Sequence, residues 1–303
     1  MAGIITTGSF PRSLLPGVNK WFGDGYNFRE PMWDKIFKKY TSNRNYEFDV
    51  AMVPTGLVPV KAQGDCITFD SMQQSFETRY VHVVYGSGII ITREEVEDDL
   101  YDIVAAKRSE ALGRSFATTK ETICANVLNN GFSGSFVGGD GVALFSLSHP
   151  YQGGVYANRL LVDSDLSESA LEQAMIDVYS FVDFRGKPVS IMGERLVIPK
   201  ELTYEAQRIL KSDLRVATAD NDMNAMKAMG VLPGGIAVNR YLTDPDAWFI
   251  VTDCPDGMKY FERRALEVAS DNDFDTENMK FKMTERYSVG WSDPKGMFGS
   301  PGA

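Results

Sequence analysis

Two histidines, His82 and His149, are the side chains best suited to acid–base chemistry near neutral pH. A catalytic histidine needs a nucleophile and an orienting acid beside it, and Ser146 and Ser148 stand close to His149 in the chain. Closeness in sequence does not make a triad, so a hydrolase that uses His149 stays only an alternative. His82 falls within an alternating strand pattern, where we expect a structural role.

An acidic segment near the C-terminus has the spacing of a calcium loop. Asp271, Asp273 and Asp275 stand at alternate positions, as in the first half of an EF-hand. The sixth position is Thr276 instead of glycine and the twelfth is Lys282 instead of glutamate, which excludes an EF-hand. We therefore expect no metal and interpret the segment as a solvated acidic turn. A weak cation site, or a contact with basic residues of neighbouring subunits, is the alternative.

Other signatures of enzyme chemistry are missing from the sequence. It contains no GxSxG nucleophile elbow, no GxxxxGK phosphate loop and no HExxH zinc motif. The glycine pairs at 23–25 and 139–141 lack the third glycine of a dinucleotide fingerprint. Cys66, Cys124 and Cys254 are odd in number and widely spaced, which is typical of reduced thiols. The sequence predicts neither an enzyme nor a cofactor.

Length and composition indicate a folded protein with a net negative charge. The 303 residues include 31 Lys and Arg against 41 Asp and Glu, a net charge of −10. This balance argues against sequence-specific nucleic-acid binding, although it suits a wall that encloses nucleic acid without gripping it. No apolar run reaches the ~18 residues of a membrane span, and no secretory signal is recognisable. The length predicts about two domains.

The elements that position any functional residue begin with an N-terminal arm. The first 30 residues are rich in Gly, Pro and Thr, yet they end in an aromatic group that includes Trp21 and Phe22. Flexible tails seldom carry so many aromatic side chains, so we expect the arm to lie on a neighbouring subunit or on its own domain. A short helix is predicted over 31–40, with Pro31 in its first turn.

Two alternating segments predict strands joined by a long excursion. Apolar residues alternate over 46–53 and again over 76–85, and prolines and glycines interrupt the pattern between them. A hairpin needs only ~2–5 connecting residues. A loop of this greater length is expected to reach a partner.

The strongest local pattern predicts a long helix. It begins at the capping box formed by Thr92 and Glu95, and the Asn-Asn-Gly sequence at 129–131 supplies its stop signal. Apolar residues recur between these limits at roughly helical spacing. A helix over 93–130 would be about 57 Å long at ~1.5 Å per residue, which suits a strut in a large assembly.

The remaining pattern predicts a compact α/β unit followed by a returning strand. Helices are expected over 167–182 and 200–211, and strands over 195–199, 236–242, 248–252 and 258–263. The last strand has an apolar face made of Met279, Phe281, Met283, Tyr287, Val289 and Trp291. The class that these elements favour is α+β.

Several motifs, taken in order, resemble a known family. They are LFSLSHP at 144–150, NRL at 158–160, DND with Asn224 at 220–224, YLTDPDAW at 241–248, DGMK at 256–259, FER at 261–263 and the tail 285–303. Together they are similar to major capsid proteins of tailed bacteriophages, in the group related to the major head subunit of phage Mu. The likeness is clearest over 92–303.

The resemblance implies the α+β capsid fold of the Hong Kong 97 type (HK97-like). Its parts would be an N-terminal arm over 1–45, an extended loop over 46–91 and a peripheral domain with a spine helix over 92–161. An axial domain over 162–267 and C-terminal peripheral strands over 268–303 would complete it.

The function that the resemblance implies is that of a major capsid protein. Copies would self-assemble as pentamers and hexamers into an icosahedral shell around double-stranded DNA, held without sequence-specific binding. Because no long helical scaffold precedes the arm, we expect a separate scaffolding protein, together with a portal and a decoration protein. The location would be the virion capsid, assembled in the bacterial host cytoplasm, with no membrane involved.

The same resemblance implies which residues make assembly contacts. The candidates are Trp21, Phe22, Lys61, Asp65, Arg215, Asp220, Asp222, Asp271, Asp273 and Asp275. Lys61 is the only lysine on the loop excursion, and the match to cross-linking members ends there, so no covalent cross-link is expected.

Two alternatives remain besides the hydrolase. One is an encapsulin-type compartment shell, and the other is a phage tail or decoration component. For the capsid reading, deletion of 54–75 is expected to spare the axial domain but to prevent stable shells. For the hydrolase, His149→Ala would abolish activity and leave assembly intact.

Overall fold

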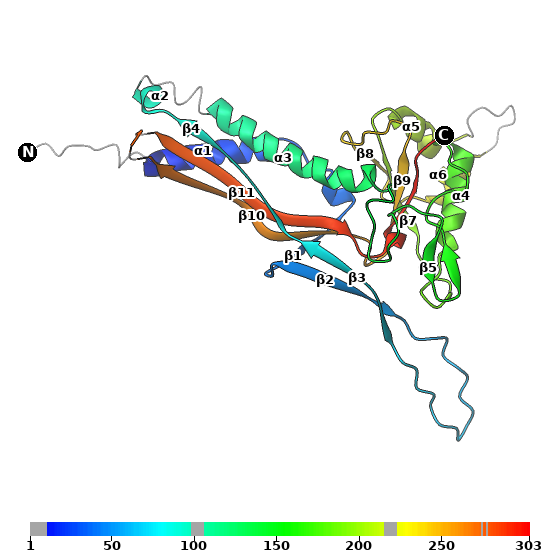
Figure 1. The fold of residues 1–303 in the computed structure, drawn as a ribbon. Helices are drawn as coiled ribbons and strands as arrows, with labels where there is room; N and C mark the ends of the chain where they lie inside the picture. The colour runs from blue at the N-terminus through cyan, green and yellow to red at the C-terminus, as the bar shows by residue number, and fades with distance from the viewer. Residues whose placement is uncertain (1–10, 98–105, 215–222, 274, 277) are drawn as a thin grey trace, which may run out of the picture.

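The computed structural model of the chain describes residues 11–97, 106–214, 223–273, 275–276 and 278–303. Within this part the molecule is elongated (Figure 1). A long sheet flanked by helices occupies one end, a smaller α/β unit occupies the other, and a two-stranded ribbon projects from the body. No helix in the described ranges combines the length and the apolarity of a membrane span.

The strands of the long sheet are, in spatial order, β1 (Lys38–Thr41), β10 (Met258–Asn272), β11 (Met279–Trp291) and β4 (Val83–Ile91). β1 runs parallel to β10, whereas the other neighbours are antiparallel. β10 and β11 form one long hairpin whose register shifts twice between Glu262 and Glu267. The apolar face predicted for β11 is confirmed, because Phe281, Tyr287 and Trp291 are all buried.

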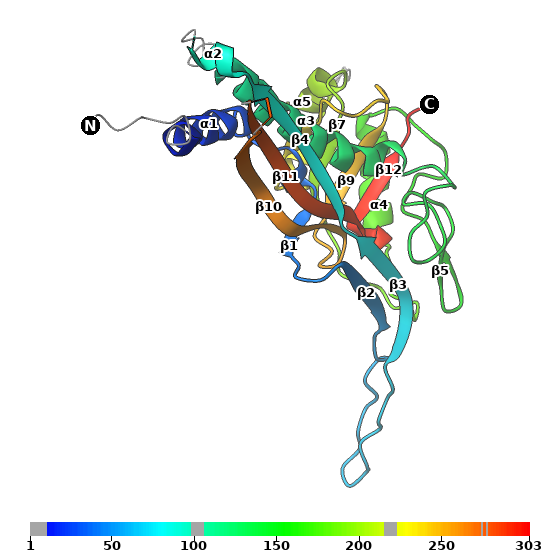
Figure 2. The same cartoon turned by 60° about the vertical axis from the view of Figure 1, so that its left-hand side comes forward.

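Two helices, α1 (Pro11–Tyr26) and α3 (Ala106–Asn129), lie side by side along one face of the long sheet (Figures 1 and 2). Phe22 of α1 and Phe116 of α3 pack together with Phe281 of β11 in one buried cluster. The arm and the spine helix therefore share a core with the centre of the sheet.

The long helix predicted over 93–130 is present wherever the chain is described. α2 (Arg93–Glu97) begins at the predicted capping box, in which the N–H of Glu95 donates to the Thr92 hydroxyl. α3 ends at the predicted stop signal. Residues 98–105 lie outside the described part, so a continuous helix from α2 to α3 stays a prediction.

The helix predicted over 31–40 is wrong. In its place stands a single 3-10 turn, η2 (Trp33–Lys35), followed by β1. Ile36 and Phe37 are buried in the core beside the long sheet, and the residues after them pair with β10. Tertiary pairing overrides the local helix signal here, because the ladder with β10 satisfies the backbone groups of β1.

The smaller unit has its own sheet and core. Its strands are, in spatial order, β12 (Met297–Ser300), β9 (Trp248–Thr252), β7 (Gly193–Ile198) and β8 (Ile236–Val238). Its described helices are α4 (Glu168–Tyr179), α5 (Thr203–Lys211) and α6 (Ala225–Met229). Leu171, Leu196 and Trp248 are fully buried between these layers. The predicted helices and strands between 167 and 252 are confirmed, with shifted ends.

The C-terminal segment contributes to both sheets. β11 ends in the long sheet, the 3-10 turn η4 (Pro294–Gly296) follows, and β12 then pairs antiparallel with β9 of the smaller unit. Earlier in the chain, β9 is followed directly by β10 of the long sheet. After its first passage from α3 into the smaller unit, the chain thus crosses twice more between the two units.

A two-stranded ribbon carries the long excursion away from the body (Figure 1). β2 (Tyr46–Val53) pairs antiparallel with β3 (Gln73–Val81), and 54–72 joins them without helix or strand. The bounds of β2 match the prediction. The strand predicted over 76–85 instead spans parts of β3 and β4, because the chain leaves the ribbon at His82.

His82 occupies the point where the ribbon joins the long sheet. Its ring is buried, with Nε2 3.1 Å from the Ser42 hydroxyl and Nδ1 2.9 Å from the Ser288 hydroxyl. Burial lowers the pKa of His82, so the ring stays neutral at physiological pH. These contacts support the expected structural role. A small hairpin of β5 (His149–Tyr151) and β6 (Gly154–Tyr156) completes the described strands.

The backbones of α1 and α3 touch at two glycines. A Cβ atom added to Gly113 would lie 2.4 Å from the carbonyl oxygen of Phe22. One added to Gly25 would lie 2.2 Å from the carbonyl oxygen of Glu110. Neither distance is tolerable for a carbon atom, so only glycine permits the observed spacing between the arm helix and the spine helix.

Gly113→Ala tests this contact. In an unobstructed helix the change stabilises by up to ~1 kcal/mol, because alanine is the better helix former. Here the methyl group would push α1 away, so we expect a lower thermal midpoint and faster hydrogen exchange in α1. Gly23→Ala is the matched control, since nothing lies within 4 Å of its added Cβ. A raised midpoint for Gly113→Ala would contradict the close approach.

Candidate functional site

Three side chains from three elements meet in a buried polar cluster, here called the arm anchor: Tyr26 of α1, Lys120 of α3 and Glu285 of β11. The Nζ of Lys120 lies 2.7 Å from Oε2 of Glu285, and the two side chains are 6% and 2% exposed. Lys120 also donates a hydrogen bond to the Tyr26 hydroxyl. The arm anchor therefore links α1 to both the spine helix and the long sheet.

Burial governs the electrostatics of the arm anchor. Burial alone would lower the pKa of Lys120, but Tyr26 and Glu285 outweigh it and raise that pKa. Burial raises the pKa of Glu285, against the opposing effect of Lys120. The carboxylate depends on Lys120 for its charge, because an unpaired ionised carboxylate is very costly in an apolar core.

The next residue of α3 holds the arm at a second point. The backbone N–H of Met32 donates to Oε1 of the buried Glu121 over 2.6 Å. Met32 stands just before η2 and β1, whereas Tyr26 ends α1. Two consecutive residues of α3 thus fix both ends of the segment that connects the arm helix to the long sheet.

The arm anchor was not predicted from the sequence. A signal existed for Glu285, which interrupts the apolar face of β11 between Met283 and Tyr287. An acid at that position is either exposed by a register change or buried with a partner. Lys120 carried no such signal, since a lysine on a long helix is ordinarily solvated.

The aromatic candidates of the arm lie against the arm's own subunit. Phe22 is fully buried in the cluster with Phe116, and Trp21 packs against the same cluster while remaining half-buried. In this arrangement they hold α1 on the body. Of the two alternatives for these residues, packing on the chain's own domain is the one observed.

A second polar cluster, here called the loop latch, joins the extended loop to the smaller unit. It lies at the neck of the loop, where Gly56 and Asp70 meet. Its members are Thr55, Gly56, Asp70, Arg185 and Lys187. Arg185 donates to both carboxylate oxygens of Asp70, over 2.8 and 3.3 Å. Lys187 donates to the carbonyl oxygen of Thr55. The N–H of Gly56 closes the neck by donating to Asp70 over 2.6 Å.

The loop latch fixes the direction in which the loop leaves the body. The Gly56 N–H and Arg185 lower the pKa of Asp70, so this carboxylate stays ionised at neutral pH. Phe76 of β3 meets Phe184 edge-on, with ring centroids 5.7 Å apart, directly beside these polar contacts. The orientation of the loop therefore depends on the position of the smaller unit.

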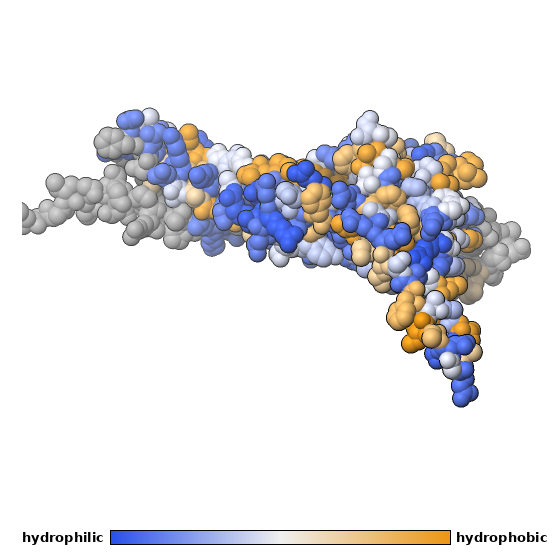
Figure 3. Space-filling model, turned by 60° about the horizontal axis from the view of Figure 1, so that its bottom comes forward, coloured by the Kyte–Doolittle hydropathy of each residue, from blue (hydrophilic) through white to orange (hydrophobic). Residues whose placement is uncertain are grey.

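Beyond the latch the loop is almost wholly exposed. Lys61 and Asp65, two of the candidate contacts, lie here in solvent. The exposed large apolar side chains are Leu57 (84%), Val58 (92%), Val60 (100%), Ile67 (66%) and Phe69 (92%). Figure 3 shows apolar surface on this protruding part. Several highly exposed apolar side chains on one projection indicate an interaction site.

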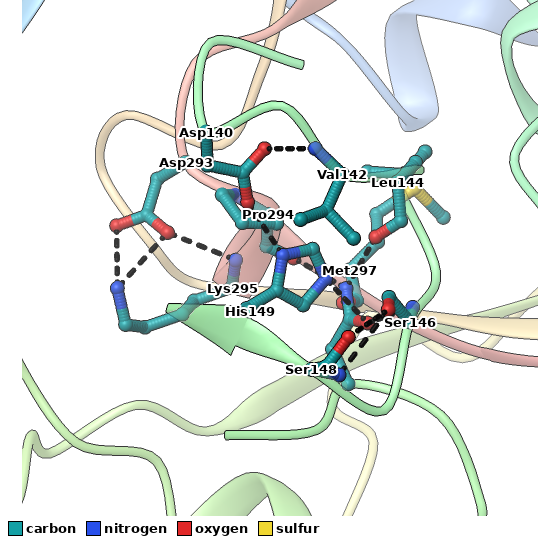
Figure 4. A network of polar contacts seen from close by, with 11 residues as sticks. Asp140, Val142, Leu144, Ser146, Ser148, His149, Asp293, Pro294, Lys295 and Met297 are labelled. Atoms are coloured by element: carbon teal, nitrogen blue, oxygen red, sulfur yellow. Dashed lines mark hydrogen bonds and ion pairs between the residues drawn. The ribbon is translucent and has the colours of Figure 1, made fainter. Parts of the chain in front are cut away.

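The histidine considered for catalysis lies in a structural network (Figure 4). His149 is fully buried, with Nδ1 2.6 Å from Asp140 and Nε2 3.0 Å from the side-chain oxygen of Asn158. The hydroxyls of Ser146 and Ser148 pair with each other over 3.3 Å. Both ring nitrogens are engaged, so neither is free to activate a serine.

Asn158 extends this network to the C-terminal segment. Its amide nitrogen donates to the carbonyl oxygens of Leu144, Pro294 and Met297, at 2.6, 3.0 and 3.2 Å. Pro294 and Met297 flank the crossing from η4 into β12. The network therefore braces the junction of the two units, and it is not a catalytic centre.

The acidic candidates form the turn of the β10–β11 hairpin. Asp271 is opposite Lys280 in the ladder, and Oδ2 of Asp273 lies 2.5 Å from the Nζ of Lys280. This hydrogen bond lowers the pKa of Asp273. Asp275 is exposed. No set of three or more acidic, histidine or cysteine side chains in the described ranges is arranged to hold a metal ion.

The remaining candidates, Arg215, Asp220 and Asp222, lie outside the described residues. Their expected place at the tip of the axial domain stays a prediction.

A family model described as phage capsid protein matches residues 76–299. Among solved structures, the capsid of cyanophage P-SCSP1u is similar with a TM-score of 0.60 at 10% identity, covering 91% of this chain and 89% of that chain. No curated protein sequence matches the chain.

Two further structures share the fold. The procapsid of bacteriophage JBD30 gives a TM-score of 0.54 at 14% identity, covering 97% of this chain and 76% of that chain. A virus-like particle from Pyrococcus furiosus gives 0.53 at 10% identity, covering 93% of this chain and 97% of that chain. The α+β, HK97-like fold predicted from the sequence is confirmed.

Lys120→Met tests the arm anchor. Removing the lysine leaves Glu285 buried without its partner, and we expect a loss of about 3–5 kcal/mol in the free energy of unfolding at pH 8. The double variant Lys120→Met/Glu285→Met should recover most of that loss, because both buried charges are then gone. Thermal or denaturant unfolding measures both.

The same variant has an expected pH dependence. Without Lys120, the pKa of Glu285 rises further above its unfolded value, so the folded state takes up a proton as the pH falls. Lys120→Met should therefore be more stable at pH 5 than at pH 8, relative to the unaltered chain. An equal loss at both pH values, or a double variant as weak as the single one, would contradict the buried ion pair.

Arg185→Ala tests the loop latch. The N–H groups of Gly56 and Ser71 both donate to Asp70, so we expect faster hydrogen exchange at these two amides. The thermal midpoint should be unchanged, because the latch lies at the surface. Lys187→Ala, which removes the contact with Thr55 and an ion pair with Asp183 but keeps Arg185 on Asp70, should give a smaller change. Exchange in 54–72 that is unaffected by Arg185→Ala would show that the latch does not orient the loop.

Proposed function

The chain belongs to the phage capsid protein family, and on that premise we propose that it is the major subunit of a tailed-phage head. As a member of a structural family it is a component of the virion capsid and not an enzyme. Copies assemble as pentamers and hexamers and close into an icosahedral shell around double-stranded DNA. The match of the family model over 76–299 carries this proposal.

The loop latch and the exposed loop support an assembly of overlapping subunits. The loop presents Val58, Val60 and Phe69 far from any core of its own chain. Burial of such side chains on a neighbour is favourable by roughly 1.5–3 kcal/mol each. Every subunit both gives and receives these contacts, so closure of a shell multiplies contacts that are individually weak.

The acidic balance supports enclosure of DNA without tight binding. The net charge of −10 gives the chain the same sign as the phosphate backbone. A strongly basic wall would release counterions from DNA and hold it, which would oppose ejection of the genome. The shell therefore encloses DNA without binding it tightly and without recognising its sequence.

The assignment to a subgroup of head proteins, the further partners and the domain boundaries rest on the sequence motifs. LFSLSHP at 144–150 and the motifs after it favour the group of head proteins related to the major head subunit of phage Mu. A scaffolding protein, a portal and a decoration protein are the further partners that this group implies. The arm, extended loop, peripheral domain and axial domain take the boundaries predicted above.

An encapsulin-type compartment is the second candidate. It is favoured by the likeness of the fold to a virus-like particle from Pyrococcus furiosus. Such a shell encloses protein cargo, whereas a phage head encloses DNA. Particles that copurify with a folded cargo protein and never protect DNA from nuclease would favour the compartment.

Electron microscopy of the purified chain, with light scattering to measure mass, tests the proposed function. Closed shells tens of nanometres across, or regular pentamers and hexamers, are the expected products. A monomer or dimer at every concentration, also when the scaffolding protein is supplied, would contradict a shell subunit.

Replacement of 57–69 by Gly-Asn-Gly tests the role of the exposed loop. The change keeps Gly56 and Asp70, so the latch can still close the neck. We expect a folded chain with an unchanged thermal midpoint that fails to form shells, because the apolar contact surface is gone. A Gly/Ser segment of the original length is the matched control and should fail equally. Normal shells from either variant would show that the loop does not hold subunits together.

A further inference from the structure

The two edge strands of the long sheet are protected very differently. β1, at one edge, is only four residues long and carries Lys38 and Lys39. Short length and lysine side chains are the usual defences of an edge against pairing with another chain. β4, at the other edge, is nine residues long and reads Val-Val-Tyr-Gly-Ser-Gly-Ile-Ile-Ile, without a single charge.

The outer edge of β4 is open in the described chain. β4 pairs on one side with β11, and no other described residue makes a backbone hydrogen bond to 83–91. Its side chains are also unusually exposed for an apolar strand, with Val84 at 54% and Ile90 at 53%. A long, uncharged, apolar edge is a template for an added strand.

No other described edge has these properties. β2 and β3 form the ribbon, and both contain charged side chains such as Asp49 and Arg79. In the smaller unit, the edge strands β12 and β8 are only four and three residues long. β4 is therefore the edge at which strand addition is best supported.

The chain contains a segment suited to this edge. Residues 1–10, which precede the described part, read Met-Ala-Gly-Ile-Ile-Thr-Thr-Gly-Ser-Phe and carry no charged side chain. The run Ile4-Ile5-Thr6-Thr7 consists entirely of β-branched residues, which favour strands. Ten residues extend over ~33 Å, enough to span nine residues of β4 at ~3.3 Å each.

We propose that residues 1–10 of one copy add a strand to the outer edge of β4 in a neighbouring copy. This inference rests on the proposed function, because it needs copies assembled side by side. It assigns the first residues of the arm a main-chain partner, and the side chains of 83–91 would be the cross-strand neighbours of the added strand.

The placement of α1 favours a neighbouring copy over the chain's own edge. α1 packs on the β10 side of the sheet, and β4 lies at the opposite edge (Figure 2). From Pro11, the chain's own segment would have to pass β10, β11 and β4, which are ~5 Å apart, before reaching the open side. That path of roughly 15 Å consumes about half of ten extended residues and leaves too few to cover β4.

The start of α1 and the end of β4 lie at the same end of the molecule, away from the smaller unit (Figure 1). Donor and acceptor therefore both face the perimeter, where the next subunit of an assembly would stand. Because each copy carries both, one type of contact can repeat around a ring.

A photo-crosslink with isotope labelling tests the proposal. The full chain with Ser9→benzoylphenylalanine is co-assembled in equal amounts with unaltered chain labelled with heavy nitrogen. After irradiation, adducts are mapped by mass spectrometry. We expect position 9 of the unlabelled variant to be joined to peptides that contain 83–91 and carry the heavy-nitrogen label. Such a light–heavy adduct arises only between two copies.

Paired proline substitutions identify the contact as a strand. In a strand the N–H groups of residues i and i+2 face the same neighbour, so Ile5→Pro/Thr7→Pro and Ile4→Pro/Thr6→Pro remove the two alternative donor sets. One pair should lower the yield of the light–heavy adduct about tenfold or more. Alanine at the same positions is the matched control and should leave the yield nearly unchanged.

Each other outcome overturns the proposal. Adducts that are only light–light would place the segment on its own copy, and adducts outside 83–91 would exclude the β4 edge. Equal yields from both proline pairs and their controls would exclude main-chain pairing. Shells that form while the adducts map elsewhere would leave the proposed function standing. Failure of the unaltered chain to assemble would count against both.

Discussion

The ion pair between Lys120 and Glu285 is the interaction on which the elongated half of the molecule depends. It lies where the arm helix, the spine helix and the central strand of the long sheet meet, and both side chains are almost fully buried. Two charges can share an apolar core only while they stay paired. Any movement of α1 or α3 that separates them is therefore opposed, and the arm leaves this half of the molecule in one direction.

The loop latch, unlike this buried ion pair, lies at the surface. The contacts of Arg185 with Asp70 lie at the surface, where ion pairs contribute little and exchange readily with water. The loop can thus change direction when the smaller unit moves, while the arm cannot leave α3 without uncovering charge. A subunit that must fit both five-fold and six-fold surroundings benefits from this division between a rigid half and an adjustable projection.

The sequence predicted elements with strong local patterns and failed where tertiary contacts decide. The helix from the Thr92 capping box, the alternation in β11 and the α/β order of the smaller unit followed from periodicity and from local start and stop signals. The helix predicted over 31–40 gave way to β1, because pairing with β10 outweighs local preference. The family motifs supplied the fold, which no periodicity would have specified.

The functional residues also divide into those that local sequence signals placed and those that only tertiary contacts bring together. Chain order placed Lys61 and Asp65 on an exposed loop, as found, since the interruptions by proline and glycine are local signals. The arm anchor depends on residues about 95 and 165 positions apart in the sequence, and no local pattern reports such a meeting. Only the acid on the apolar face of β11 hinted at it.

The two short C-terminal crossings between the two sheets have a mechanical consequence. Besides the longer path through α3, outward force on the smaller unit is carried into the long sheet through two short covalent connections, from β9 into β10 and from β11 into β12. β12 and β9 are antiparallel neighbours with Met297 opposite Val251, so both connections leave the smaller unit at the same end of this strand pair. Asn158 ties both ends of the second connection to the 131–160 loop. In a wall built from such units, covalent backbone would carry tension across each subunit, while the contacts between subunits would carry it from one copy to the next.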